Sequence, residues 1–155
     1  MRTRLASLIA VLMTLAPSMA MAAACKLENA TFRPKYAAQS FEIRSSRVGG
    51  VLVFDVMVHK TREIFRFRVD ADGGTGAGTI TSIPDAAGQD PGIRSSLQLL
   101  DGKGLKITST GDVGHVSFLE LGRAFVDFRM RRSRNVEPYT SPPSDLWHLT
   151  DCRPD

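Results

Sequence analysis

The sequence contains few of the residues on which small catalytic and metal-binding domains depend. Its 155 residues include two cysteines, three histidines, one tryptophan and two tyrosines. Two cysteines are too few for a scaffold held by several disulfides, and they cannot supply the paired motifs of a structural zinc site. With an aromatic content of only 7%, the sequence also gives little support for a carbohydrate-binding platform of exposed rings.

The histidines form no metal-binding motif. His59, His115 and His148 are far apart, and none lies in a His-x-His or His-Glu-x-x-His pattern. A shared site would require the fold to collect them from distant positions, so we expect ordinary surface or hydrogen-bonded histidines. The sequence therefore predicts no metal site and no cofactor.

Motifs for nucleophilic or phosphate chemistry are absent as well. There is no Gly-x-Ser-x-Gly elbow. The glycine-rich run over residues 73–78 precedes a strand-like segment, whereas a phosphate loop precedes a helix. Several aspartates stand beside glycine or proline, where turns are expected. We predict that the protein is not an enzyme; a small hydrolase, with carboxylates collected by the fold, is the less favoured alternative.

No hydrophobic run is long enough to cross a membrane. The longest, residues 5–16, covers about a dozen residues, whereas a spanning helix needs roughly 20. It follows two arginines and precedes alternating small residues, which is the pattern of a secretory signal peptide. We therefore predict a signal peptide over residues 1–24, cleaved near residues 20–24.

The predicted mature domain, residues 25–155, carries little net charge. The chain has a net charge of +4, but the leader holds two arginines and no acid, so 18 basic and 16 acidic residues remain. Nucleic-acid-binding domains are usually strongly basic, and this one is not. We expect a soluble bacterial protein, periplasmic or secreted, with no transmembrane span in the mature chain and no nucleic-acid partner.

Cys25 and Cys152 bracket nearly the whole mature domain. In an oxidising compartment two such thiols are expected to pair, and we predict a disulfide bond between them. The alternative is a lipid on Cys25. However, Ala22 stands where lipoprotein signals usually have leucine, and lipidation would leave Cys152 unpaired. Closing so long a loop would remove about 4.5–5 kcal/mol of unfolded-chain entropy.

Short segments of alternating hydrophobicity dominate the mature domain. Residues 63–70 place apolar side chains on one face, with Arg66 and Arg68 on the other, as a half-buried strand requires. With strands over residues 51–58 and 79–83, this segment predicts an antiparallel three-stranded meander.

Further strands are expected from the same pattern. They cover residues 27–32, 40–44, 97–100, 105–108, 116–121, 124–130 and 146–152. One short helix could occupy residues 34–39 or 93–99. The fold class is therefore predicted as all-β: a single-domain antiparallel sandwich or up-and-down barrel of about 8–10 short strands.

Arginines are the most informative polar residues. Arg66 and Arg68 share one strand face, and Arg129 and Arg131 share the parity of a second expected strand. If both strands lie in one sheet, the four arginines form a surface suited to carboxylates and phosphates. A solvated face balanced by nearby acids is the alternative.

These features favour an exported, non-enzymatic binding module. It would contact an anionic envelope component or a protein partner, using the arginine-rich sheet face as its ligand-binding surface. A structural or assembly accessory that pairs through an exposed strand edge is the alternative function.

Overall fold

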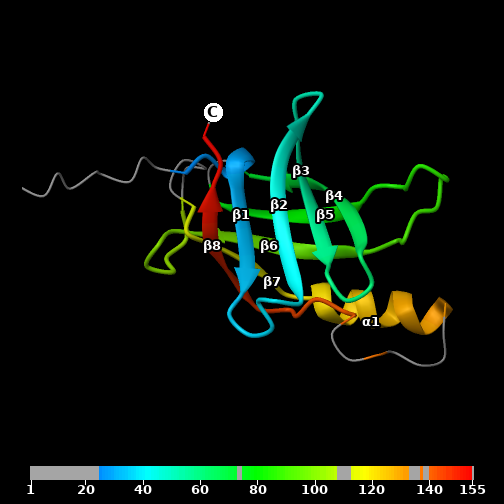
Figure 1. Ribbon diagram of the computed structural model, residues 1–155. Helices are drawn as coiled ribbons and strands as arrows, with labels where there is room; N and C mark the ends of the chain where they lie inside the picture. Colours follow the sequence, from blue (N-terminus) through cyan, green and yellow to red (C-terminus); the bar gives the residue numbers. More distant parts are fainter. Residues whose placement is uncertain (1–24, 73–74, 108–112, 133–136, 138–139, 155) are drawn as a thin grey trace, which may run out of the picture.

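The computed structural model contains a closed barrel of eight antiparallel strands (Figure 1). It describes residues 25–72, 75–107, 113–132, 137 and 140–154. The strands are β1 (Ala30–Pro34), β2 (Phe41–Val48), β3 (Val51–Val58), β4 (Glu63–Ala71), β5 (Ala77–Ser82), β6 (Arg94–Leu100), β7 (His115–Phe118) and β8 (Leu146–Cys152). Each strand pairs with the next along the chain, and β8 returns to pair with β1.

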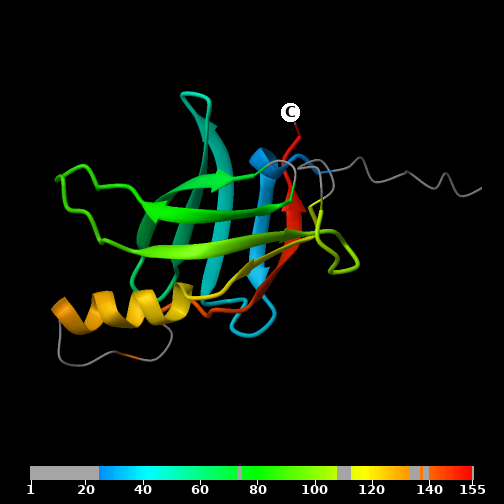
Figure 2. The ribbon, with the colours of Figure 1, turned by 180° about the vertical axis from the view of Figure 1, so that it is seen from behind.

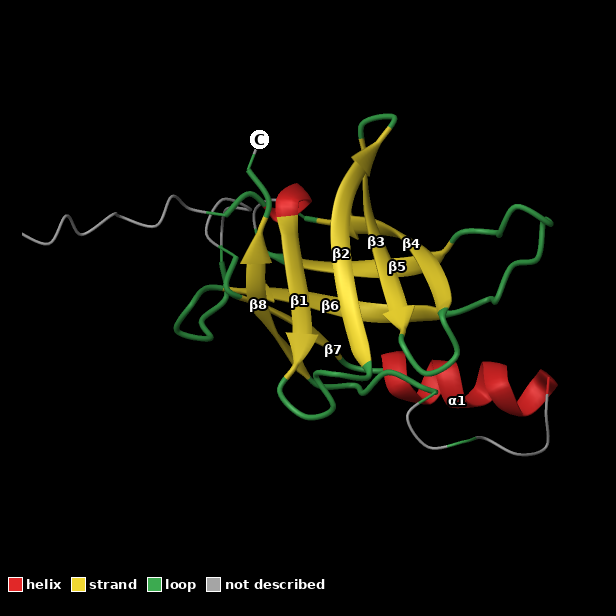
Figure 3. Ribbon diagram, in the orientation of Figure 1, coloured by secondary structure: helices red, strands yellow, loops and turns green. Residues whose placement is uncertain are grey.

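Two helical elements accompany the strands (Figure 3). A 3-10 turn, η1 (Leu27–Asn29), precedes β1, and the helix α1 (Leu121–Arg132) lies between β7 and β8. The predicted all-β antiparallel fold is confirmed, and the barrel is the form that it takes.

Apolar side chains from all eight strands fill the barrel interior. Phe54 and Phe118 lie edge to face with ring centroids 6.4 Å apart, and Phe118 meets Trp147 in the same way at 6.1 Å. All three side chains are fully buried. From Phe65 to Asp70, inward apolar and outward polar residues alternate along β4, which is the period-two pattern read from its sequence.

Residues 124–130 form part of α1, so the strand predicted there is wrong. The same segment satisfies helical spacing, because Leu121, Phe125 and Phe128 recur on one helical face and all three are buried. Gly122, between the strands expected over residues 116–121 and 124–130, lies in the first turn of this helix.

Three smaller predictions also differ from the structure. Residues 93–99 lie almost wholly in β6. Pro34 ends β1 and residues 35–39 form bends and turns, so neither segment holds a helix. The strand expected at residues 105–108 is reduced, in the described part of the chain, to one isolated bridge between Leu100 and Lys106. The first expected strand begins with the η1 turn.

A disulfide bond joins Cys25 to Cys152, as predicted, with the two Cα atoms 5.8 Å apart. It lies beside the contact that closes the barrel, where β1 and β8 pair at five positions and Ala30 stands opposite Cys152. We call this contact the closing seam. Because the barrel leaves neither terminal strand as an edge, the bond reinforces a seam that is already paired.

The helix α1 lies across one end of the barrel (Figure 2). Phe125 anchors it, with its ring 4.8 Å from that of Phe65 and 6.1 Å from that of Phe67. The last turn carries three arginines, whose charges favour the negative end of the helix dipole. The helix thus presents a cationic end beside the mouth of the barrel.

Among the described residues, no helix has the length and apolar character needed to cross a membrane. The predicted signal peptide and its cleavage site near residues 20–24 lie outside the described residues.

Candidate functional site

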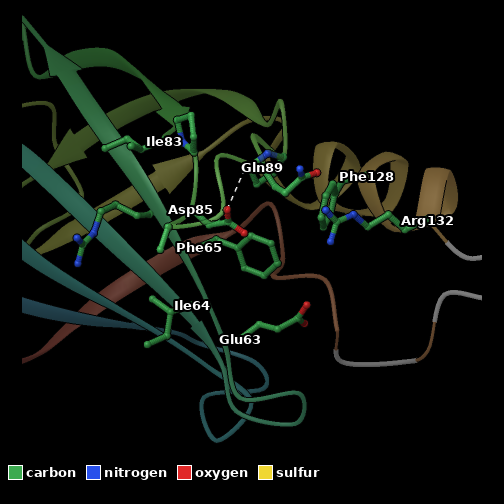
Figure 4. A pocket seen from close by; sticks show the side chains of 12 residues that line it. Glu63, Ile64, Phe65, Ile83, Asp85, Gln89, Phe128 and Arg132 are labelled. Atoms are coloured by element: carbon green, nitrogen blue, oxygen red, sulfur yellow. Dashed lines mark hydrogen bonds between the residues drawn. The ribbon is translucent and has the colours of Figure 1, made fainter.

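A cleft opens at the end of the barrel that α1 covers (Figure 4). It is bounded by the first four residues of β4, by the loop between Ile83 and Pro91, and by Phe128 and Arg132 of α1. Its volume is about 440 Å³, within the range of small ligand sites. We call it the β4 cleft.

The cleft exists because β5 ends before its neighbour β4 does. Their ladder stops at the pair of Phe67 and Ser82, after which the Ile83 N–H donates one more hydrogen bond, of 2.8 Å, to the Arg66 carbonyl. Pro84 comes next, with a fixed φ and no N–H to donate to a neighbouring strand. The chain leaves the sheet there, so the first three residues of β4 pair with β3 alone.

The loop that forms the second wall is held by two aspartates. Asp85 Oδ1 accepts hydrogen bonds from the backbone N–H groups two and four positions ahead, at 2.9 and 2.8 Å (Figure 4). Asp90 Oδ1 accepts one from the Ser82 hydroxyl at 2.7 Å and one from the Gly92 N–H at 2.9 Å. These bonds, the Ser82 one foremost, hold the pKa of Asp90 below its usual value. The wall is therefore a folded turn with its own hydrogen bonds.

Glu63 and Arg129 form a bidentate ion pair at the side of the cleft nearest the β3–β4 turn. Arg129 Nη1 lies 2.8 Å from Glu63 Oε1, and Nη2 bonds to Oε2. The same guanidinium lies over the rings of Phe65 and Phe128, 5.4 and 5.8 Å from their centroids. The hydrogen bond from Arg129 lowers the pKa of Glu63, although burial acts in the opposite direction. Glu63 is therefore ionised at neutral pH, with its charge balanced by Arg129.

Arg132 differs from Arg129 in having no carboxylate partner within the described part of the chain. Its guanidinium lies 4.9 Å from the centroid of the Phe128 ring and is exposed to solvent. Figure 4 shows the side chains of Phe128 and Arg132 extending from α1 toward the cleft, opposite Phe65. The cleft thus combines an aromatic wall with a cation that is free to meet an anion.

The four arginines predicted to bind a ligand do not share a sheet face. Arg66 and Arg68 lie on the outer face of β4, as expected, and each is paired with an aspartate. Arg66 makes two bonds to Asp55, of 2.8 and 2.9 Å, while Arg68 bonds to Asp70 at 3.0 Å.

Arg129 and Arg131 lie on α1, so their predicted strand position is wrong. Arg131 Nη2 donates to the carbonyl oxygen of Pro91 at 3.2 Å, and so links the helix to the loop wall. Of the four predicted arginines, only Arg66 lines the β4 cleft. Arg129 and Arg131 contact two of its lining residues, Glu63 and Pro91, whereas Arg68 lies further along β4. Their role in ligand binding stays a prediction.

Of the residues that line the cleft, only Arg66 was among the four arginines predicted to bind a ligand. Ile64, Phe128 and Arg132 are three of those that were not predicted. A signal for the two helix residues was present, because Leu121, Phe125 and Phe128 follow helical spacing and arginines cluster just after them. No local sequence pattern marked Ile64 as a cleft residue. It lines the cleft because β5 ends before it reaches Ile64.

Two of the three histidines are neighbours in the structure. His115 and His148 stand opposite each other on β7 and β8 with ring centroids 4.8 Å apart, while His59 lies in the β3–β4 turn. The described residues contain no group of three or more histidine, cysteine, aspartate or glutamate side chains that could hold a metal ion.

Comparison of the chain with protein-family models, with curated protein sequences and with solved structures finds no match.

Proposed function

We propose that this protein is an exported, non-enzymatic binding module whose β4 cleft contacts an envelope component or a protein partner. The observation that supports it is the contrast between two parts of the molecule. The barrel interior is filled with buried side chains, whereas the external cleft has aromatic walls and the cation of Arg132, which has no carboxylate partner among the described residues. Binding sites commonly combine an apolar surface with a few directed polar groups.

The carboxylates of the cleft support binding over hydrolysis. A general acid usually needs a raised pKa, but the pKa of Glu63 is lowered by its bond to Arg129. Asp85 accepts two backbone hydrogen bonds that fold the loop wall. Both carboxylates are thus engaged in holding the cleft together.

The disulfide supports an extracytoplasmic location. Disulfides persist in oxidising compartments and are rare in the cytosol, and Cys25 and Cys152 are paired. Together with the leader-like N-terminal sequence, this favours a periplasmic or secreted protein.

Site-specific photo-crosslinking tests the proposed function. A benzophenone side chain would replace Ile64, which lies at the cleft and is 62% exposed, in the protein expressed in its native cells. The matched control replaces Leu105, which is 63% exposed in the loop after β6. We expect a discrete adduct from position 64 alone. Equal labelling at both positions, or none at position 64, would refute a partner at the cleft.

A further inference from the structure

At the start of β4, Ile64 has backbone groups on the cleft side that pair with no strand in the described part of the chain. Backbone groups two residues apart in a strand point to the same side. The Arg66 carbonyl accepts its bond from Ile83 across the β4–β5 seam, so the N–H and C=O of Ile64 face that seam too. No residue of β5 pairs with Ile64. The cleft therefore runs along a short open sheet edge.

The side chains beside this edge alternate between two environments. Phe65 is 8% exposed and points toward α1 with Glu63, whereas Ile64 points away (Figure 4). A strand laid along the edge would follow the same alternation. Its residue opposite Ile64 would face outward, and the residues opposite Phe65 and Glu63 would face α1.

The two α1-facing positions differ in polarity. Opposite Phe65 lie the ring of Phe128 and the apolar surface around it, which suit an apolar side chain. The position opposite Glu63 lies near the positive charge of Arg132, which contributes to the lowered pKa of the Glu63 carboxyl. Because Arg129 already balances Glu63, Arg132 remains available for a further carboxylate.

We propose that the β4 cleft binds an extended segment of a partner protein, which adds as an antiparallel strand to residues Glu63–Arg66. Its sequence, read from the N-terminus, is an apolar residue, any residue, and an aspartate or glutamate. The apolar side chain packs on Phe65 and Phe128, and the carboxylate meets Arg132. This inference rests on the proposed function and specifies its partner.

The direction of the bound segment follows from the sheet. β5 runs antiparallel to β4, and the added strand continues along the line that β5 leaves at Pro84. In that direction the position opposite Phe65 comes before the position opposite Glu63. Strand addition of this kind takes affinity from main-chain hydrogen bonds and specificity from alternate side chains.

A pair of terminally blocked peptides tests this order. Ser-Thr-Leu-Thr-Glu-Thr-Ser carries the motif, and Ser-Thr-Glu-Thr-Leu-Thr-Ser has the same composition in reverse. Titrated into the ¹⁵N-labelled disulfide-bonded protein, the first should shift the amide resonances of Glu63–Arg66 and protect the Ile64 amide from exchange. The reversed peptide should bind at least about tenfold more weakly.

Two N-methylated versions of the first peptide distinguish binding through backbone hydrogen bonds from binding through side-chain contacts alone. N-methylation of the central threonine removes the N–H that would face Ile64, and should abolish binding. N-methylation of the leucine alters a group that faces away from β4 and serves as the control. Neither modification touches the protein, so the result does not depend on a variant that folds.

The Arg132 contact has its own matched pair of variants. R132S should weaken the first peptide by about tenfold, the usual scale of a charge-assisted hydrogen bond. R123S removes an exposed arginine from the same helix, outside the cleft, and should leave binding unchanged. The R132S variant should also lose its preference for glutamate over glutamine in the peptide.

Three results would overturn the inference. They are equal affinity for the forward and reversed peptides, binding that survives N-methylation of the central threonine, or a crosslinked adduct at position 64 that contains lipid or polymer instead of protein. The last result would leave the proposed binding function standing. Absence of any adduct at position 64 would remove the proposed function together with the inference.

Discussion

Two of the contacts between neighbouring strands of the barrel, which we call seams, differ sharply in how completely they are paired. At the closing seam, β1 and β8 pair at five positions and a disulfide bond lies beside them. At the β4–β5 seam, pairing stops where Pro84 begins, and the first three residues of β4 have only one neighbouring strand. The two seams belong to one sheet, yet one is reinforced and the other is partly open.

This difference shows how one sheet can serve both stability and recognition. Backbone groups used within the barrel stabilise it, whereas groups left unpaired at an edge form a template for another strand. The open length is short, and the loop behind it is folded by Asp85 and Asp90. A short edge of this kind can accept one extended segment without offering a long surface for aggregation.

Removing the disulfide should have the largest effect on the reinforced seam. The double variant C25S/C152S is expected to lose about 2–5 kcal/mol of unfolding free energy, because its unfolded chain regains the entropy of a long closed loop. Urea denaturation measures this loss. Wild-type protein unfolded under reducing conditions should match the variant, and a loss below about 1 kcal/mol would contradict the assigned role.

Glu42 and Glu63 allow the two regions to be compared through single substitutions. Glu42 is buried on β2, between Arg33 of β1 and Arg44. Since both arginines are half exposed, E42Q should cost about 1–3 kcal/mol of stability. It should leave the cleft unchanged.

E63Q should lower the stability less than E42Q does and should change the cleft more. Glu63 is about one-third exposed, so its pair with Arg129 contributes less to global stability, and we expect a loss of about 1 kcal/mol. The loss of its charge should instead perturb the amide resonances of the cleft. Thermal unfolding and NMR spectra of both variants test the comparison, which fails if E42Q alters the cleft more than E63Q does.

Acid should weaken both regions within one pH window. Burial raises the pKa of Glu42, but the bonds from Arg33 and Arg44 together outweigh it and lower the pKa; Arg129 lowers that of Glu63. A lowered folded-state pKa means that each carboxylate stabilises the fold above the ordinary value of 4.5. That stabilisation is lost as the pH falls below 4.5 through the folded-state value. In E42Q and E63Q the acid-dependent loss of stability should be smaller than in the wild type, as followed by urea denaturation from pH 6 to about 3.

The smallest global effect is expected from loosening the loop wall. D90A removes the acceptor of two hydrogen bonds in an exposed loop, so it should cost about 0.5–1 kcal/mol. Amide exchange should rise over residues 82–93 and at the cleft. D101A removes two comparable bonds in the loop after β6, and its effect should stay in that loop.

Much of the barrel could be predicted from the sequence, because period-two alternation is a local property. The β4 segment shows it clearly, with inward Phe65, Phe67 and Val69. The disulfide could be predicted from composition and compartment. Barrel closure could not, since the pairing of β1 with β8 is a long-range contact that no local pattern specifies.

The candidate site was harder to predict for a related reason. In residues 124–130, apolar residues fit both a strand and a helix, and the barrel end selects the helix because Phe125 and Phe128 then pack against Phe65. The expected arginine surface required residues 124–130 to form a strand, with Arg129 and Arg131 on one of its faces. Once the segment is helical, Arg129 turns to Glu63, and the neighbouring Arg132 takes the open position.

The closing seam also sets the order in which this chain can fold. β1 can pair with β2 soon after both have been synthesised, but its other partner, β8, follows only after every other strand. Until then the growing sheet has two unpaired edges, and long-range pairings of this kind are slow to form. The barrel can therefore close only once its last strand, β8, is available to pair with β1.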